Sequence, residues 1–448
     1  MHPLMHPLMH PLVKQLQQTL PPNTSKICVA LSGGLDSRVL FELAKQFKQA
    51  RQQQEHQPKI QLRAIHIHHQ LSQFADDWAA FSQAICDAAK VPLSIYQVDT
   101  KDFATASLED RARRARYQVF EQELQAGEVL LQGHHQDDQV ETLLLRLLRG
   151  AGTLGLASIP LQRPLGKGLI LRPLLNTPRS ELLKFAQAAQ LTWVEDDSNF
   201  EVDFDRNFLR LDILPLLQKR FPNTNTNLAR VTQLAADSQQ LNQDLAQLDL
   251  AHCLLTEHSL NLKSFLKLAD YRQVNLLRYW LRIRNLTLPG HKIWQELTKL
   301  YSAGEDTQPI ICWDKGAAQV EARRFQNQLF IAPSHYFQPL ANNWQASWDG
   351  KSPFNTPVGK IDFQLVNQQG SDPKTHSSIP PFIPFILKAR QGGEKLRQTK
   401  RGQRDVKRLL QELALPPWQR NQLVFIWQQD QLVAVDQYLV AEGWQIIK

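Results

Sequence analysis

The sequence predicts an α/β protein with a doubly wound parallel-sheet domain at its N-terminus, a mainly helical middle domain and a small α+β C-terminal domain. Strand-like apolar runs alternate with helical periodicity up to about residue 217. Leucine and alanine recur at helical spacing over 228–300, and a basic segment, a helix and two short hairpin strands follow near the C-terminus. With 42% apolar residues and no run near the roughly 20 that a membrane span needs, the composition is that of a globular protein.

These patterns divide the 448 residues into five segments. Residues 1–12 repeat Met-His-Pro-Leu and are expected to form a disordered lead-in without the features of a secretory signal. The α/β domain, the middle domain, a linker with one strand near 361–366 and the basic domain are expected at 13–217, 218–340, 341–380 and 381–448.

Five strands are expected in the α/β domain, at 27–31, 60–67, 93–98, 129–132 and 169–175. The helices are expected to begin at Arg38, to cover 76–89, to begin near Ser107 and near Asp137, and to cover 178–190. Strands that alternate with helices form a parallel sheet covered on both faces. Ligands of such sheets bind at the carboxyl ends of the strands.

The first strand runs directly into Ser32-Gly33-Gly34-Leu35-Asp36-Ser37, and a helix follows. Glycines let the backbone approach an anion closely, and the free N–H groups of a helix N-terminus point at it. Unlike the familiar phosphate loop, this loop has no lysine. Its polar side chains are two hydroxyls and the Asp36 carboxylate, so a bound metal is expected to supply positive charge. An ordinary strand-to-helix turn is the alternative interpretation.

Polar side chains also follow the second and fourth strands. His66 belongs to a histidine cluster at 66–69, which we expect to line the ligand crevice in preference to binding a metal. Asp137 and Glu141 are four residues apart on one helix face, where like charges repel unless a cation lies near. A metal or a substrate ammonium would serve as that cation. An acidic first turn favoured by the helix dipole is the alternative.

Two clusters of positive charge indicate an anionic partner. Arg113 is one of four arginines within 111–116, which repel one another unless polyphosphate or nucleic acid lies near. Nine basic and two acidic residues between 388 and 408 account for most of the net charge of +8, and a phosphate-bearing partner is expected. The four cysteines form no Cys-x-x-Cys pair, which favours a reducing cytoplasm over a metal or disulfide scaffold.

Taken together, these motifs resemble one protein family. The loop over 32–37 resembles the signature loop of the N-type ATP pyrophosphatases, which cleave ATP between the α and β phosphates and adenylate a second substrate. The chain is similar to one branch of them, the tRNA(Ile)-lysidine synthetases, over 66–69, 109–117, 133–142, 149–152, 195–199, 206–207, 390–394 and 417–418. The resemblance covers about residues 25–448.

The resemblance implies a cytoplasmic ligase that adenylates the wobble cytidine of a tRNA(Ile) with a CAU anticodon and replaces AMP by the ε-amine of L-lysine. ATP and Mg²⁺ would be required, and both a monomer and a homodimer remain open. The implied residues are Asp36, Arg113 and Asp137 for catalysis; Ser32, Gly33, Gly34, Leu35, Asp36, Ser37 and His66 for ATP; Asp36 for Mg²⁺; Asp137 and Glu141 for lysine; and Lys395, Arg397, Lys400, Arg401, Arg404 and Arg206 for tRNA. The alternatives are a tRNA thiolation enzyme of the same superfamily, which usually carries cysteine pairs, and a non-catalytic ATP-dependent RNA-binding protein.

Overall fold

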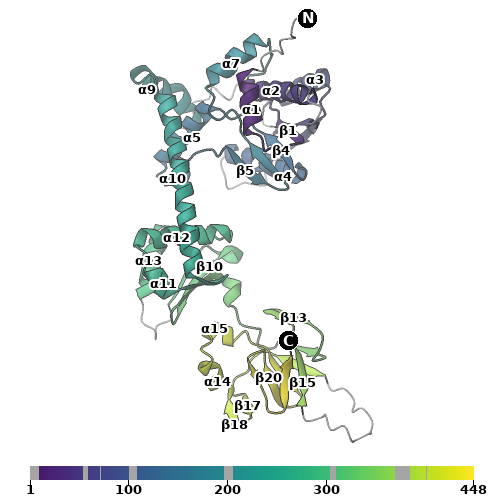
Figure 1. Cartoon of the computed structure of the whole chain (residues 1–448), viewed down its shortest axis with the longest axis vertical. Coiled ribbons are helices and arrows are strands. Elements are labelled where there is room, and N and C mark those ends of the chain that lie inside the picture. Colours follow the sequence, from purple (N-terminus) through teal and green to yellow (C-terminus); the bar gives the residue numbers. More distant parts are fainter. Residues whose placement is uncertain are drawn as a thin grey trace, which may run out of the picture. The chain divides into compact units, whose positions relative to one another are not determined.

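The computed structural model describes residues 10–53, 59–70, 72–99, 108–195, 205–302, 309–368, 384–399 and 401–447. The chain divides into two compact units, 1–242 and 243–448. Figure 1 shows the helices and strands of the whole chain. Helix α10 (Thr224–Cys253) includes residues of both units. Across the described ranges, none of the helices combines the length and the apolar character that crossing a membrane requires.

The first unit is built on a six-stranded sheet. Its strands are β1 (Lys26–Ala30), β2 (Gln61–His68), β3 (Leu93–Gln97), β4 (Glu128–Leu131), β5 (Gln162–Leu165) and β6 (Gly168–Leu171). They lie in the order β3-β2-β1-β4-β6-β5, and only β5 runs antiparallel to its neighbour. The predicted doubly wound parallel sheet is therefore confirmed.

Two features of the sheet differ from the sequence prediction. Strand β5 was not expected, since Gln162-Arg163-Pro164 is polar and contains a proline, which a sheet tolerates at its edge. The last parallel strand ends at Leu171, where 175 was expected. The chain turns there, because the N–H of Leu175 donates to the carbonyl of Arg172 at 3.2 Å.

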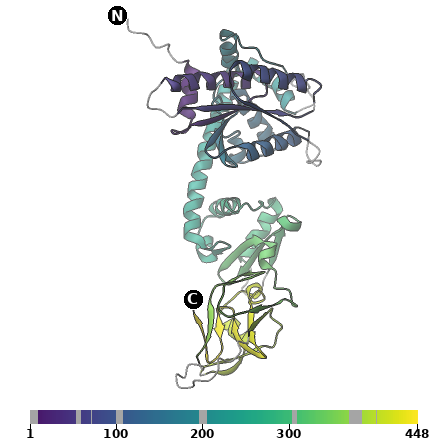
Figure 2. The same ribbon diagram turned by 90° about the vertical axis from the view of Figure 1, so that its right-hand side faces the viewer.

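Helices cover both faces of this sheet (Figure 2). The longer ones are α1 (Pro11–Thr19), α2 (Leu35–Gln52), α3 (Ala75–Ala88), α4 (Leu108–Glu123), α5 (Gln136–Leu148) and α7 (Arg179–Ala188). Short helical segments complete the unit: α6 (Thr153–Leu156), α8 (Asp205–Phe208), the π-helical turn η3 (Leu209–Ile213) and α9 (Leu214–Arg220). The expected alternation of strands and helices is present.

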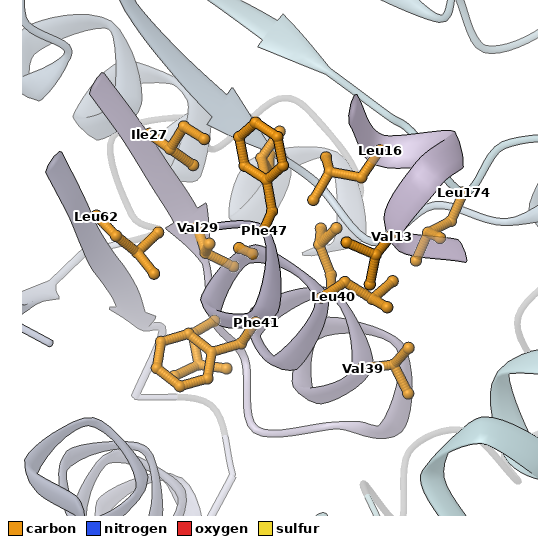
Figure 3. Packing of buried hydrophobic residues seen from close by; sticks show 14 of the residues in the cluster. Val13, Leu16, Ile27, Val29, Val39, Leu40, Phe41, Phe47, Leu62 and Leu174 are labelled. Carbon is orange, nitrogen blue, oxygen red and sulfur yellow. The ribbon is translucent and has the colours of Figure 1, made fainter. Parts of the chain in front are cut away.

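Side chains packed between β1 and the helices fix the loop that joins β1 to α2 (Figure 3). Ile27 and Val29 of β1 are each 0% exposed, as is Leu40 of α2. Burying one such side chain contributes about 1.5–3 kcal/mol, so a shift of either element would be costly. Helix α1 adds Leu16 to the same cluster.

Helix α1 also bears on the predicted lead-in over 1–12. Residues 1–9 lie outside the described residues. Residues 11 and 12 belong to α1, and Leu12 is 5% exposed within the apolar core. The end of the repeat is therefore ordered, because its last leucine starts an amphipathic helix.

The N-terminal part of the second unit combines helices with an antiparallel sheet. Helices α11 (Leu262–Leu266), α12 (Asp270–Ile283) and α13 (His291–Ser302) accompany the end of α10 and agree with the predicted helical periodicity. The strands of the sheet are β7 (Leu254–Thr256), β8 (Ser259–Asn261), β9 (Ile310–Trp313), β10 (Val320–Phe325) and β11 (Gln328–Pro333). The short 3₁₀ helix η4 (Gly316–Ala318) lies between β9 and β10 in the chain. Strands β7 and β8 are too short to interrupt the helical pattern of the sequence and were not expected.

The C-terminal part of this unit holds a second five-stranded sheet, in the order β12-β16-β19-β20-β21. Its strands are β12 (Gln345–Trp348), β16 (Phe385–Lys388), β19 (Phe425–Gln428), β20 (Gln431–Val435) and β21 (Leu439–Val440). Around it lie η5 (Ser334–Phe337), α14 (Val406–Glu412), α15 (Pro417–Arg420) and the strand pairs β13 (Phe354–Thr356) with β14 (Gly359–Ile361), β15 (Gln364–Asn367) with β22 (Trp444–Ile447), and β17 (Lys395–Gln398) with β18 (Gly402–Asp405).

This arrangement corrects the predicted linker over 341–380. Strand β12 pairs with β16, and β15 pairs with β22. Trp348, Ile361 and Leu365 are at most 5% exposed and pack in the core of the C-terminal part. Residues 345–367 are thus folded, because isolated apolar side chains in a polar stretch supply the sheet's inner face. Residues 369–383 lie outside the described part of the chain.

Candidate active site

The loop between β1 and α2 is shaped by one glycine and two serines. Gly33 has a φ of +91°, and a Cβ atom there would lie 2.9 Å from Cγ2 of Val194. Ser37 Oγ accepts the N–H of Ser32 at 3.2 Å and donates to the Gly34 carbonyl at 3.0 Å. No described side chain caps α2, so its first N–H groups are left for an anion. The predicted phosphate-binding residues, Leu35 included, form one closed turn.

Asp36 lies at the mouth of this loop, in the first turn of α2. Its Oδ1 is buried and accepts no hydrogen bond from the described residues, and its Oδ2 lies 3.5 Å from Nε2 of His135. Such an oxygen suits Mg²⁺, which usually takes one or two carboxylates together with substrate phosphates. Among the described residues no group of three or more His, Cys, Asp or Glu side chains could hold a metal, so phosphate oxygens would complete the ligand set.

His135 connects two carboxylates from neighbouring helices. Its Nε2 lies 3.5 Å from Asp36 Oδ2 and 3.6 Å from Asp138 Oδ2. Burial disfavours the imidazolium, but the two carboxylates outweigh it and raise the pKa of His135 to about 9. Burial likewise disfavours the Asp138 carboxylate, yet His135 and Arg206 lower its pKa to about 2. A charged histidine therefore separates acids at the starts of α2 and α5.

Glu141 lies in a different environment from the one that the sequence predicted. It is 0% exposed, and both of its oxygens are bound by arginines. Arg206 Nε donates to Oε2 and Arg210 Nε donates to Oε1, each at 2.6 Å. Arg206 also donates to Asp138 Oδ1 at 2.6 Å. The cation beside Glu141 was expected to be a metal or a substrate ammonium, but two arginines of the protein bind it, because a buried carboxylate needs a partner. Arg206, predicted to bind tRNA, lies in this ion-pair network.

Asp137 differs from Glu141 in lying on a cavity. The cavity has a volume of about 320 Å³, and its lining also includes Arg179, Gln218 and Asn225. Asn225 Nδ2 donates to Asp137 Oδ1 at 3.3 Å. The cavity therefore offers one acidic and one basic side chain to a small ligand, and its volume lies within the range of small-molecule sites.

His66 lies behind the loop, at the end of β2. It is 4% exposed, and its Nδ1 lies 2.8 Å from the carbonyl oxygen of Leu31, the residue before the loop. Ser82 Oγ lies 3.3 Å from the same nitrogen, and burial lowers the pKa of His66. A neutral His66 thus holds the backbone that leads into the predicted phosphate-binding turn.

Comparisons with known proteins agree with this geometry. Residues 8–217 match the family described as PP-loop domain, 260–330 match the TilS substrate binding domain, and 385–447 match the TilS substrate C-terminal domain. A tRNA(Ile)-lysidine synthase of Xanthomonas axonopodis pv. citri is 38% identical over 419 residues, which cover 93% of this chain and 90% of the relative. One of Pseudomonas putida is 39% identical over 415 residues, 91% of each.

This chain belongs to the tRNA(Ile)-lysidine synthase family. The resemblance drawn from the sequence motifs is confirmed. A solved structure of a U34-tRNA thiolase from Methanococcus maripaludis is also similar, at 19% identity and a TM-score of 0.41, over 50% of this chain and 78% of that one.

In this member of the tRNA(Ile)-lysidine synthase family, the predicted tRNA-binding residues of the C-terminal domain lie on one hairpin. Lys395 and Arg397 belong to β17, Arg404 belongs to β18, and Arg401 lies in the turn between them, all exposed. Arg397 pairs with Glu442 at 2.9 Å and Arg401 pairs with Glu412 at 3.4 Å. Lys400 lies outside the described residues.

Several residues of the site carry no assignment in the sequence analysis. His135 lies next to Asp36, and Arg210 donates to Glu141. The ring of Tyr117 is stacked by arginines, among them Arg113. The only sequence signal for Arg210 is its spacing of four residues from Arg206, which matches the spacing of Asp137 and Glu141. The contact itself joins residues 69 positions apart and depends on the fold.

Proposed function

We propose that this chain is a ligase that converts the wobble cytidine of a tRNA(Ile) with a CAU anticodon into lysidine, which changes the codon and amino-acid specificity of that tRNA. ATP is consumed to AMP and pyrophosphate, free L-lysine is the second substrate, and the cytoplasm is the compartment. Family membership supports the reaction class. One observation carries the proposal. Strand β1, which ends in the turn that we assign to phosphate, pairs with β4, and the chain continues from β4 to Asp137 and its cavity.

In the first step, the carbonyl oxygen of the cytosine attacks the α phosphate of ATP. A new oxygen–phosphorus bond forms, and the bond between the α phosphorus and the bridging oxygen breaks, so that pyrophosphate leaves. Backbone N–H groups of the turn and the Ser32 hydroxyl meet the negative charge that develops on phosphate. Asp36 would hold Mg²⁺, which supplies positive charge when it is bound. We assign Arg113 to the adenylate or the leaving phosphate.

In the second step, the ε-amine of lysine attacks the activated base carbon, and AMP leaves. Asp137 holds the lysine ammonium and takes the proton that the attacking amine must lose. Arg179, on the same cavity, complements the lysine carboxylate. Both oxygens of Glu141 are bound by arginines. We therefore propose that Glu141 contributes to lysine binding only by fixing the position of α5, the helix that carries Asp137.

The basic hairpin of the C-terminal part would hold tRNA phosphates. Lys395 and Arg404 are exposed there, with Lys400, Arg401 and Arg397 in the same segment. Phosphate contacts position a nucleic acid but do not read its sequence. Neutralising Lys400, Arg401 and Arg404 together should therefore weaken tRNA binding and flatten its dependence on salt.

The deciding experiment is the transfer of labelled lysine to bulk tRNA in the presence of ATP. We expect incorporation and AMP release that depend on both lysine and tRNA. Asp137→Asn should abolish incorporation, whereas Asp87→Asn, the same change at an exposed position of α3, should not. No incorporation into any tRNA by the unmodified chain would exclude the proposal. AMP release without any lysine requirement would favour a thiolation enzyme.

A further inference from the structure

Arginines around Tyr117 form a positive cluster that the proposed reaction does not fully use. The guanidinium carbons of Arg113 and Arg163 lie 5.0 and 4.6 Å from the centroid of the Tyr117 ring. Stacking on an aromatic ring orders a guanidinium and leaves its N–H groups for other acceptors. Arg113 and Arg163 are both exposed, so these N–H groups can meet a ligand.

A third arginine lies beneath this pair. Arg172 is 1% exposed and donates to Pro160 O at 2.7 Å, to Tyr117 Oη at 3.2 Å and to His134 Nδ1 at 3.3 Å. None of the three acceptors is a carboxylate, and burial lowers the pKa of His134 to about 3, so that ring is neutral. A buried guanidinium usually has a carboxylate partner, because removing its charge from water costs several kcal/mol.

Among the described residues, the cluster therefore lacks a carboxylate partner. In the part of the chain that the structure describes, no acidic side chain forms an ion pair with Arg113, Arg163 or Arg172. Burial lowers the pKa of Arg172; Tyr117 opposes this shift, and Arg163 and Arg113 add to it. Three guanidiniums around one phenol are stabilised by an external anion, and phosphate fits the planar fork of arginine best.

The place of Arg163 in the sheet indicates which phosphate this is. Arg163 lies in β5, and β5 is separated from β1 by β6 and β4. Three strand spacings put the backbone of Arg163 about 14 Å from β1, and its side chain ends on the Tyr117 ring and not on the turn after β1. Gln132, which follows β4 directly, accepts the hydroxyl of Tyr117 at 3.2 Å, so the ring that holds Arg113 and Arg163 lies beside the end of β4.

We propose that Arg163, held on Tyr117 and backed by Arg172, binds a backbone phosphate of the RNA strand beside the nucleotide that is modified. This rests on the proposed function for the identity of the RNA. An RNA that brings its base to the α phosphate places its own backbone further out along the sheet, where Arg163 lies. Arg163 is a positioning residue, because it orients the strand and does not touch the reacting atoms.

The test measures binding of a fluorescent tRNA(Ile) transcript with a CAU anticodon to the full chain, at several salt concentrations and without ATP or lysine. Arg163→Gln should raise Kd about tenfold at low salt and reduce the slope of log K against log salt by roughly 0.7, the loss of one phosphate contact on a single strand. Arg163→Lys keeps the charge and should retain the slope while losing part of the affinity.

Lys167→Gln is the matched control. It removes the same charge from the same hairpin, at the exposed turn between β5 and β6, and should change neither Kd nor slope. ATP binding by Arg163→Gln should equal that of the unmodified chain. An unchanged tRNA Kd, or a weaker affinity for ATP or lysine in place of tRNA, would overturn the inference. A chain that binds tRNA as expected but forms no lysidine would refute the proposed function and leave this phosphate site standing.

Discussion

Replacing Glu141 by glutamine tests whether the buried ion-pair network holds α5 in place. Glu141 is 0% exposed and accepts from Arg206 at 2.6 Å and from Arg210 at 2.6 and 2.9 Å. Removing one partner of a buried pair costs about 3–5 kcal/mol, because the other charge is left unpaired. The side chains of Arg206 and Arg210 are 25% and 35% exposed, so both can turn partly toward water. We therefore expect a loss of about 2–3 kcal/mol.

Hydrogen exchange of the amides over 136–148 in the full chain is the appropriate measurement, because it reports opening of one segment. Tryptophan fluorescence would report mainly on the second unit, which holds all of the tryptophans except Trp78 and Trp193. Exchange of slowly exchanging α5 amides should accelerate about 30-fold or more. Glu181→Gln, at an exposed position of α7, should leave their exchange unchanged.

A second variant separates charge from packing. Adding Arg210→Met to Glu141→Gln removes the guanidinium that loses both of its hydrogen bonds to Glu141, while Arg206 keeps its bond to Asp138. Part of the lost protection should therefore return, which is a non-additive effect of residues in contact. If the double variant exchanges as fast as Glu141→Gln alone, the cost does not come from unpaired charge and the reasoning fails.

Three further changes test other parts of the chain. Gly33→Ala should reduce ATP affinity at least about tenfold by calorimetry, because the new Cβ lies 2.9 Å from Val194 Cγ2 at a φ of +91°; unchanged affinity would contradict the turn's role. The pKa of His135 is raised from 6.5 to about 9, so the imidazolium contributes up to about 3 kcal/mol to folding stability. This stability is fully present below pH 6.5 and is lost as pH rises through 9. Hydrogen exchange of amides in the first unit should show this loss of protection, and the His135→Asn variant should not show it. Trp418→Ala should cost about 3–5 kcal/mol in urea unfolding of the second unit, since Trp418 is 5% exposed and packs against Phe330, yet ATP binding should persist.

The sequence was sufficient for the fold wherever a pattern repeats over many residues. The alternation of strands and helices predicted the doubly wound sheet, since each parallel strand is buried on both faces and reads as an apolar run. Strand β5 was not predicted, because it lies at the edge of the sheet and contains Pro164. The segment around Trp348 looked like a linker because its apolar side chains are isolated in the sequence and meet only when β12 pairs with β16.

The candidate site was predictable only where its residues are neighbours in the chain. Ser32 and Ser37 bond to each other within one turn, so the loop could be interpreted locally. Glu141 and Arg210 are 69 residues apart, and no periodicity indicates that they meet. For this reason the sequence predicted that Asp137 and Glu141 on α5 bind a metal or a substrate cation. In the structure, two arginines of the protein bind both oxygens of Glu141.

The junction between β1 and β4 supports the proposal that a loop without lysine holds a phosphate. A Cβ at Gly133 would lie 3.0 Å from the carbonyl oxygen of Asp36, so glycine there lets the starts of α2 and α5 approach each other. Asp36 and Asp138 then come within reach of one imidazolium, that of His135, which offsets their repulsion. His135 lies nearest to Oδ2 of Asp36, while Oδ1 accepts no hydrogen bond from the described residues. A lysine in the loop would pair with that oxygen, whereas without one the oxygen is available to the Mg²⁺ that we propose to accompany the nucleotide.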